Sequence, residues 1–285
     1  MAETILITGA TGNVGVEIIG ALRGSGHTLR AAVTNVERAR TRLGDDIDYA
    51  VFDFVRPETF APAYEGVTRM FLMRPPQISD IPRYITPAIV AAKQAGVQQI
   101  VFMSLLGVEK NPVVPHAKVE AAILATGVPY TFLRPSFFMQ NLSTTHRDEI
   151  RDGSEIFVPA GHGATSFIDA RDIAAVAALA LTEDGHANKA YPLTGSAALT
   201  YDQVGEILTA VLGRPIRYRN PSIPAFIARR RARGEALAFI LVMCAIYTTA
   251  RLGLAKYVTD DTERLLGRAP ITLRQFVEDN RGTWM

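Results

Sequence analysis

Three glycines near the start of the chain have the spacing of a phosphate-binding turn. Gly9, Gly12 and Gly15 lie where an apolar run at residues 4–8 meets an apolar helical pattern at residues 14–22. In a strand–turn–helix unit, such glycines let backbone N–H groups and the helix dipole approach a pyrophosphate. A side chain at Gly9 or Gly12 would crowd the phosphate, and one at Gly15 would push the helix off the sheet. The motif therefore predicts a dinucleotide-binding site.

The end of the next predicted strand indicates which dinucleotide binds. An acidic residue about 20 positions past the glycines would bind the adenosine ribose hydroxyls of NAD. Residues 32–35 contain no acid, and Arg38 follows one helical turn later. Arg38 is a candidate contact for a 2′-phosphate, or a solvated helix residue with Asn35 as its N-cap.

Two polar residues are candidates for work on a substrate. His116, just after Pro115 at a predicted helix entrance, is the nearest group that exchanges protons near neutral pH, with helix capping as the alternative. Ser104, at the end of a predicted strand, could hydrogen-bond a substrate oxygen or only the local backbone. The chain has five histidines and one cysteine without metal-ligand spacing, so we expect no metal site.

The elements that would position these residues alternate along the first half of the chain. Short β-branched runs predict strands at residues 29–33, 48–52, 69–73, 99–104 and 130–133. Helical patterns at 84–95 and 117–125 end at Gly96 and Gly127, and further helices begin at about Asp172 and Tyr201. This alternation predicts an α/β, Rossmann-like doubly wound parallel sheet. We expect a dinucleotide-binding core at residues 1–135 and a smaller, mostly helical substrate-side region at 136–285, interleaved with the last strands of the core.

Composition excludes several other classes of protein. The 285 residues carry a net charge of +2, which gives no reason to expect a nucleic-acid partner. The apolar run 236–247 is too short to span a bilayer and favours a buried or pocket-lining helix. Its single cysteine, Cys244, is expected to be a buried, inert thiol. With no signal-peptide pattern, we expect a cytoplasmic protein without a membrane partner, either a monomer or a homodimer.

Several segments together resemble one family, the NmrA-like branch of the atypical short-chain dehydrogenase/reductases. The resemblance runs over nearly the whole chain. The segments that carry it are 8–15, 71–76, 102–104, 129–135 with 137–142, 167–174, and a tail at 258–261, 267–270 and Phe276.

The resemblance implies a set of cofactor contacts and a cofactor preference. Members that use NADPH carry basic residues at the second strand's end and one turn later; Thr34 replaces the first and Arg38 matches the second. NADP(H) is therefore favoured over NAD(H), with no flavin. Asp53 matches a family residue near the adenine, or is simply a turn residue. The implied cofactor-binding residues are Gly9, Thr11, Gly12, Asn13, Val14, Thr34, Arg38, Asp53, Phe54, Met73, Arg74, Pro75, Lys118, Pro135 and Phe138.

The catalytic pattern of the wider family is incomplete here. Short-chain dehydrogenases usually pair a Tyr with a Lys, whose ammonium lowers the pKa of the phenol so that it can protonate a carbonyl oxygen. Lys118 stands where the branch has its lysine, but Val114 occupies the position four before it. This departure argues against ordinary ketone chemistry and suits a substrate whose reduced form is a stabilised anion. Lys118 would fix the nicotinamide ribose, or it is a surface residue.

The family also places apolar residues around the nicotinamide. The implied substrate contacts are Phe137, Phe138, Met139, Phe226, Met243 and Tyr247, with Phe239 as a further candidate. An aromatic lining favours a flat, conjugated substrate. For the residues from 226 onward, ordinary core packing is the favoured alternative. The basic cluster at 229–233 is expected to be a solvated face or a lid, or to meet an acidic group or a partner.

The leading functional hypothesis is an NAD(P)H-dependent reductase of a quinone-like or polycyclic aromatic small molecule, acting by direct hydride transfer. A variant is tailoring of an aromatic polyketide, in which the hydroquinone reacts with oxygen and the net reaction is a monooxygenation. A second class is a non-catalytic sensor of the dinucleotide redox state. Sugar-nucleotide epimerisation is disfavoured, because it relies on the Tyr and Lys pair.

Overall fold

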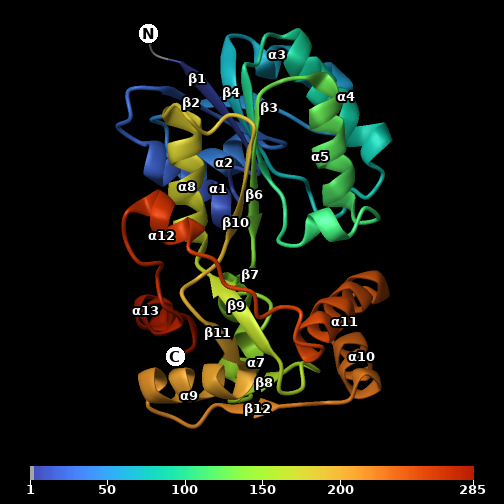
Figure 1. Cartoon of the computed structure of the whole chain (residues 1–285), viewed down its shortest axis with the longest axis vertical. Coiled ribbons are helices and arrows are strands. Elements are labelled where there is room, and N and C mark those ends of the chain that lie inside the picture. The colour runs from blue at the N-terminus through green and yellow to red at the C-terminus, as the bar shows by residue number, and fades with distance from the viewer. Residues whose placement is uncertain (1–2) are drawn as a thin grey trace. The chain divides into compact units, whose positions relative to one another are not determined.

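The computed structural model describes residues 3–285 and forms two compact units, each built from two stretches of chain (Figure 1). The first unit contains the chain up to Pro135 and Ala170–Leu193. The second contains Ser136–Asp169 and Thr194–Met285.

The first unit is organised around one parallel sheet. Within the described residues this sheet has seven strands in the order β10-β6-β5-β4-β1-β2-β3, and every neighbouring pair is parallel. Its strands are β1 (Thr4–Thr8), β2 (Thr28–Val33), β3 (Asp48–Val51), β4 (Val67–Leu72), β5 (Gln99–Met103), β6 (Tyr130–Pro135) and β10 (Lys189–Leu193). The predicted α/β, doubly wound class is confirmed.

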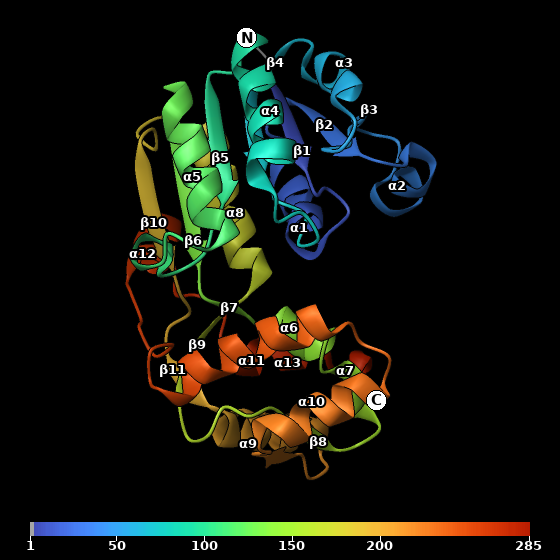
Figure 2. The same cartoon turned by 90° about the vertical axis from the view of Figure 1, so that its right-hand side faces the viewer.

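Helices cover both faces of this sheet. α1 packs against α8 on one face, while α3, α4 and α5 lie on the other (Figures 1 and 2). These helices are α1 (Asn13–Leu22), α2 (Val36–Leu43), α3 (Phe60–Tyr64), α4 (Ile81–Gln94), α5 (Pro115–Thr126) and α8 (Ala170–Thr182). α1 buries Val14, Ile18, Ile19 and Leu22, the i, i+4 spacing that marks a helix facing a core. α5 ends at Gly127, whose φ of 72° suits glycine.

The second unit contains a three-stranded sheet, a two-stranded sheet and several helices. Its strands are β7 (Phe137–Phe138), β9 (Ala164–Ile168) and β11 (Ala198–Thr200) in one sheet, and β8 (Glu155–Phe157) paired with β12 (Arg217–Arg219). Its helices are α6 (Gln140–Ser143), α7 (Arg147–Arg151), α9 (Tyr201–Leu212), α10 (Ile223–Ala232), α11 (Leu237–Arg251), α12 (Asp261–Leu266) and α13 (Leu273–Asp279). Its core is rich in aromatic rings, among them Phe167, Tyr201, Phe226 and Tyr247.

Candidate functional site

The glycine turn between β1 and α1 is held by its own backbone. The N–H of Gly12 donates to the carbonyl of Gly9 at 2.9 Å, and Gly9 has a φ of 63°. A Cβ on Gly15 would lie 2.2 Å from the Gly9 oxygen, far inside van der Waals contact. The first turn of α1 therefore sits directly against the turn, a packing that requires glycine at position 15.

The N-terminus of α1 is suited to an anion. Gly12 is its N-cap, and among the described residues no side chain caps the helix or places an acid in its first turn. Its first N–H groups and the positive end of its dipole are thus available, as binding of a pyrophosphate requires. Asn13 is exposed and Thr11 half-buried at this end. The residues present fit a dinucleotide.

Thr8 joins the glycine turn to the loop after β4. Its hydroxyl donates to the carbonyl of Phe71 at 3.1 Å and accepts from the N–H of Met73 at 2.7 Å. Met73 lies against the turn so closely that a Cβ on Gly9 would come 2.7 Å from its sulfur. The structure thus brings together Gly9 and Met73, two predicted cofactor contacts 64 residues apart.

Arg74 organises the loop that follows. Its Nη1 donates to the carbonyls of Pro75 at 2.8 Å and Ile78 at 2.7 Å. Its Nε is buried and has no hydrogen-bond partner among the described residues. A buried guanidinium with one unsatisfied N–H is a donor that a bound polar group could use.

The predicted N-cap and several predicted cofactor contacts lie just after β2 and β3. Asn35 caps α2, accepting from the N–H of Arg38 at 2.9 Å, which confirms the predicted N-cap. Thr34 and Arg38 are both exposed. Asp53 is a turn residue, since its carboxylate accepts from the N–H of Val55 at 3.1 Å. Phe54 is buried and packs edge-on against Phe52.

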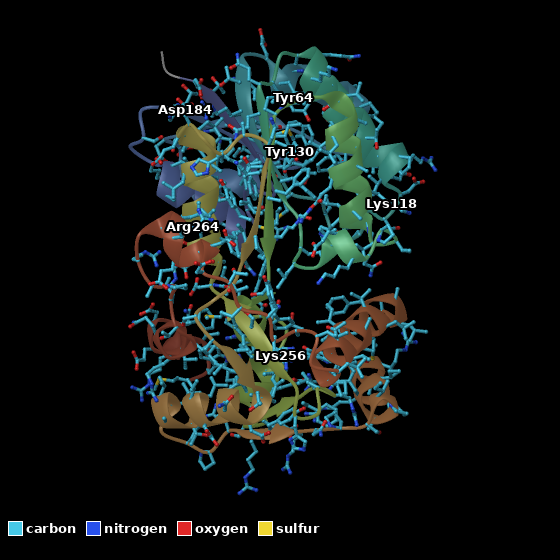
Figure 3. The ribbon with its side chains drawn as sticks, in the orientation of Figure 1. Tyr64, Lys118, Tyr130, Asp184, Lys256 and Arg264 are labelled. Atoms are coloured by element: carbon cyan, nitrogen blue, oxygen red, sulfur yellow. The ribbon has the colours of Figure 1, made fainter. Side chains whose placement is uncertain are left out.

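His116 and Lys118 lie in the first turns of α5. Val114 is the N-cap of this helix and makes no side-chain bond, so the prediction that His116 caps it is wrong. Burial, and then the nearby charge of Arg74, lower the pKa of His116 to about 4. The imidazole is therefore neutral near pH 7, which disfavours proton exchange there. Lys118 is exposed on the same helix (Figure 3).

Ser104 belongs to a buried polar group that the sequence did not reveal. Its hydroxyl donates to Glu120 Oε1 at 2.6 Å, rather than to the local backbone. Arg134 holds the same carboxylate at both oxygens, with Nε at 3.0 Å from Oε1 and Nη2 at 2.7 Å from Oε2. A bidentate pair of this kind fixes geometry as well as charge. This group connects α5, through Glu120, to the ends of β5 and β6. Because the Ser104 hydroxyl is engaged by Glu120, Ser104 has a positioning role.

In the second unit, the predicted substrate contacts separate into two groups. Phe137 and Phe138 are half-buried, and Met139 is buried. Phe226, Met243 and Tyr247 are 0%, 5% and 2% exposed, inside the core of the unit. Their assignment to a substrate surface stays a prediction, and their burial favours the packing alternative. Phe239 is 49% exposed. Cys244 is buried, as expected, and burial raises its pKa.

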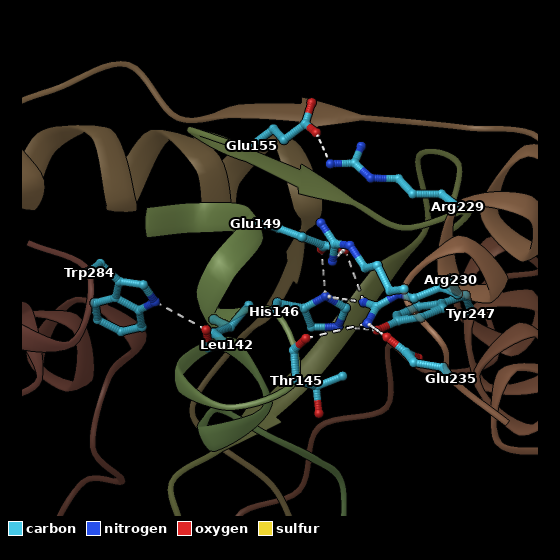
Figure 4. Close-up of polar contacts among 11 residues, drawn as sticks. Leu142, Thr145, His146, Glu149, Glu155, Arg229, Arg230, Glu235, Tyr247 and Trp284 are labelled. Atoms are coloured by element: carbon cyan, nitrogen blue, oxygen red, sulfur yellow. Dashed lines mark hydrogen bonds and ion pairs between the residues drawn. The ribbon is translucent and has the colours of Figure 1, made fainter. Parts of the chain in front are cut away.

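A charged cluster lies within this core, around Arg230 (Figure 4). Arg230 is 2% exposed and pairs with Glu149 at 3.2 Å and Glu235 at 2.7 Å. His146 contacts Glu149 at 3.0 Å through Nδ1 and the Tyr247 hydroxyl at 2.6 Å through Nε2. The prediction that residues 229–233 form a solvated face or lid is therefore wrong for Arg230.

The other arginines of that run also have partners. Arg233 contacts Glu149 at 2.9 Å, and Arg229 pairs with Glu155 and covers the ring of Phe157 at 4.2 Å. Burial alone would raise the pKa of Glu149, but His146, Arg230 and Arg233 hold it below its usual value. His146 and Glu149 are three residues apart, a spacing that places them on one helical side and was the available signal.

Over residues 3–285, no helix is long and apolar enough to cross a membrane. The same residues contain no group of three or more His, Cys, Asp or Glu side chains placed to hold a metal ion.

The parallel sheet with its glycine turn defines a Rossmann-type dinucleotide-binding protein. The chain belongs to the NmrA-like family, which it matches over residues 1–238. It is 32% identical over 278 residues to an NAD(P)H azoreductase of Xenophilus azovorans, a match that covers 96% of each chain.

Two solved structures are similar to the chain over nearly its whole length. The chain is similar to the Citrobacter sp. triphenylmethane reductase complexed with NADP(H), with a TM-score of 0.86 and 28% identity over 97% of this chain and 99% of that one. It is also similar to the NADPH-dependent quinone oxidoreductase of Escherichia coli complexed with NADPH. There the TM-score is 0.88 and the identity 26%, over 96% of this chain and 99% of that one.

Proposed function

We propose that this protein is an NADPH-dependent oxidoreductase that reduces a quinone-like or polycyclic aromatic small molecule by direct hydride transfer. The observation that carries the proposal is the uncapped N-terminus of α1 packed on the turn at Gly9 and Gly15. Three relatives support it. The azoreductase and the quinone oxidoreductase are named for NAD(P)H and NADPH, and the structures of the triphenylmethane reductase and the quinone oxidoreductase hold NADP(H) and NADPH.

NADPH is the proposed cofactor because of the charge at the end of β2. The strand ends at Val33 and is followed by Thr34 and Asn35, neither of which would repel a 2′-phosphate. Arg38 is exposed in the first turn of α2, whose dipole also favours an anion there. A guanidinium binds a phosphate through paired N–H donors.

The side chains near α5 suit an acceptor that does not need a strong proton donor from the protein. When bound, NADPH supplies a hydride. Lys118 contributes an exposed positive charge and has no Tyr four residues before it; His116 is neutral near pH 7, and Ser104 is engaged by Glu120. A quinone or conjugated dye becomes a stabilised anion on reduction and takes its proton from water. Positioning then supplies most of the catalysis.

The test is oxidation of NADPH and of NADH at 340 nm with menadione and with a hydroxyanthraquinone, with oxygen consumption recorded in parallel. We expect turnover with NADPH that falls at least tenfold in Lys118→Ala. Stoichiometric oxygen uptake with a hydroxylated product would instead indicate the monooxygenase variant. Tight dinucleotide binding without turnover on either acceptor would contradict the proposal and favour a sensor.

A further inference from the structure

Arg74 carries a positive charge that no carboxylate among the described residues neutralises. The residue is half-buried just after β4, and burial lowers its pKa without any carboxylate acting in the other direction. By contrast, Arg134, another half-buried arginine of the first unit, pairs with Glu120 at 2.7 Å. Charges removed from water are normally paired in this way. The unpaired guanidinium of Arg74 therefore favours an anion supplied by a ligand.

The backbone fixes the direction of this guanidinium. Its Nη1 donates to the carbonyls of Pro75 at 2.8 Å, Pro76 at 3.2 Å and Ile78 at 2.7 Å. Neither Nε nor Nη2 donates to any residue of the described chain 3–285. One amino group thus anchors the side chain to its own loop, and the remaining N–H groups are left for another partner. A donor held in place before a ligand arrives loses little entropy when the ligand binds.

His116 is a second polar group near Arg74 without a hydrogen-bond partner in residues 3–285. Its ring lies 6.2 Å from that of Phe102 between centroids, at a tilt of 33°. The charge of Arg74 acts on this ring and, together with burial, lowers its pKa. A neutral imidazole has one N–H to donate and adds no charge of its own. Arg74 therefore supplies the charge, and His116 can supply one directed donor.

The topology places both residues on one half of the expected dinucleotide site. From β1, the strands β2 and β3 lead to one edge of the sheet, and β4, β5 and β6 lead towards the other. A dinucleotide crosses such a sheet where the strand order reverses. The proposed contact of Arg38 with the 2′-phosphate puts the adenosine half beyond β2, so the nicotinamide half lies beyond β4 and β5. Arg74 follows β4, and His116 follows β5 at the start of α5, all within the first unit.

Reduction of a quinone produces the kind of charge that Arg74 could bind. A hydride that leaves C4 of NADPH forms a new bond to the acceptor, and its electron pair leaves one quinone oxygen negative until water protonates it. In ordinary short-chain dehydrogenases a tyrosine would protonate that oxygen, but Val114 stands at the corresponding position here. A fixed positive charge beside the oxygen lowers the energy of the same anion without transferring a proton.

We infer that Arg74 binds the quinone oxygen that becomes negative during reduction, with His116 as a second donor. The inference rests on the proposed function and narrows its substrate class to acceptors whose reduced form is an oxygen anion. A cationic dye loses its charge when it accepts a hydride, so its reduction gains nothing from Arg74. The role differs from the cofactor contact that the family resemblance implies for this residue.

The first test measures anion binding without turnover. Alizarin, a hydroxyanthraquinone that changes colour on ionisation, is titrated spectrophotometrically across pH with the NADP⁺-loaded protein. We expect the wild type to bind the alizarin anion at least tenfold more tightly than the neutral dye, and Arg74→Gln to lose this preference. Arg74→Lys keeps the charge and should retain part of it. Arg30→Gln is the matched control, because Arg30 is also half-buried and donates to the carbonyls of Ala63 and Glu65.

The second test separates the charge of Arg74 from its structural contacts. With menadione, kcat should fall at least tenfold in Arg74→Gln, because the developing oxygen anion loses its partner. With malachite green, a cationic triphenylmethane dye, kcat should not fall. Damage to the loop after β4 would slow both reactions, and Arg30→Gln should slow neither.

Several results would overturn the inference. They are equal affinity of the wild type for the two forms of alizarin, an unchanged preference in Arg74→Gln, the same loss of preference in Arg30→Gln, or an equal fall of kcat with both acceptors. A Kd for NADP⁺ that rises in Arg74→Gln by the same factor would assign Arg74 to the cofactor instead. If the anion preference depends on Arg74 and neither acceptor is reduced, the proposed function fails while the anion site stands.

Discussion

The Tyr247 hydroxyl lies 2.6 Å from Nε2 of His146, within hydrogen-bond distance, and this contact joins α11 to the charged cluster around Arg230. Nδ1 of the same ring lies 3.0 Å from the Glu149 carboxylate and 3.1 Å from Nη2 of Arg230. Burial lowers the pKa of His146 and agrees with a neutral ring. Both ring nitrogens of this buried histidine thus have side-chain partners.

Removing that hydroxyl should destabilise the second unit without changing its shape. Tyr247→Phe leaves Nε2 of His146 buried without a hydrogen-bond partner, which costs about 1–3 kcal/mol of unfolding free energy. Urea denaturation followed by circular dichroism measures this loss. Tyr257→Phe, at a tyrosine that is exposed, is the control and should match the wild type. Equal midpoints for all three proteins would show that the hydrogen bond contributes nothing.

Arg230 should be far more important for stability than its neighbour. Arg230→Met removes the pairing partner of Glu235 and one partner of buried Glu149, at a cost of about 3 kcal/mol. Arg231→Met changes an exposed residue of the same helix and should stay within about 0.5 kcal/mol of the wild type. The urea midpoints of the two variants measure this difference in unfolding free energy. A loss as large in Arg231→Met would mean that the cluster is not the cause.

Two glycines of α1 should respond oppositely to alanine. In Gly15→Ala the new Cβ meets the Gly9 carbonyl, so the turn must shift, and we expect NADPH binding to weaken at least tenfold. At Gly20 a Cβ meets no described atom within 4 Å, so Gly20→Ala should stabilise the helix by about 0.5–1 kcal/mol. Isothermal titration with NADPH and a thermal melt test both. Unchanged affinity in Gly15→Ala would contradict the proposed cofactor site.

Stability should fall as the pH is lowered from about 6.5 towards 4. The pKa of His116 is about 4 in the folded protein against 6.5 for the free side chain, so between these values the unfolded chain binds the extra proton. At pH 4.5 this histidine should cost about 2 kcal/mol relative to pH 7. In urea unfolding, the free energy of unfolding of His116→Gln should therefore fall by about 2 kcal/mol less than that of the wild type between pH 7 and pH 4.5. His162→Gln, at an exposed site, is the control and should behave like the wild type. An unaltered pH dependence in His116→Gln would refute the assignment.

Two of the three exposed arginines of α2, Arg38 and Arg42, should differ in their effect on cofactor choice. Arg38→Gln should raise the KM for NADPH about tenfold and leave that for NADH unchanged, because a contact to the 2′-phosphate is lost. Arg42→Gln, near the other end of the helix, should alter neither. Steady-state kinetics with both cofactors provide the comparison. If Arg38→Gln weakens both cofactors equally, Arg38 does not recognise the phosphate.

Local patterns were sufficient to predict much of the first unit. Ile5, Leu6 and Ile7 form a continuous apolar run because β1 is covered on both faces, and glycines mark the turn beside it. Boundaries were less accurate: α4 begins at Ile81 rather than at residue 84, and α5 begins at Pro115 rather than 117. β10 was missed because its first residues, Lys189 and Ala190, are exposed at the edge of the sheet.

The second unit and its polar groups could not be predicted in the same way. Arg230 looks solvated because it stands among other arginines, and one of the two carboxylates that pair with it, Glu149, lies 81 residues earlier in the chain. Glu120 and Arg134 likewise meet only after α5 has packed on the sheet. Charged residues that pair across a long stretch of chain leave no local periodicity. Their presence can be seen in the sequence, but their partners cannot.

The first unit is assembled from two separate stretches of chain, and this affects its biosynthesis. A ribosome that has released residues only as far as Pro135 has made six of the seven strands that the described chain contributes to the sheet, but not α8 or β10. Until Leu193 emerges, the apolar side of α1 that α8 will cover stays open to other chains and to chaperones. A gene truncated at codon 135 should therefore yield an aggregating fragment rather than a free dinucleotide-binding domain.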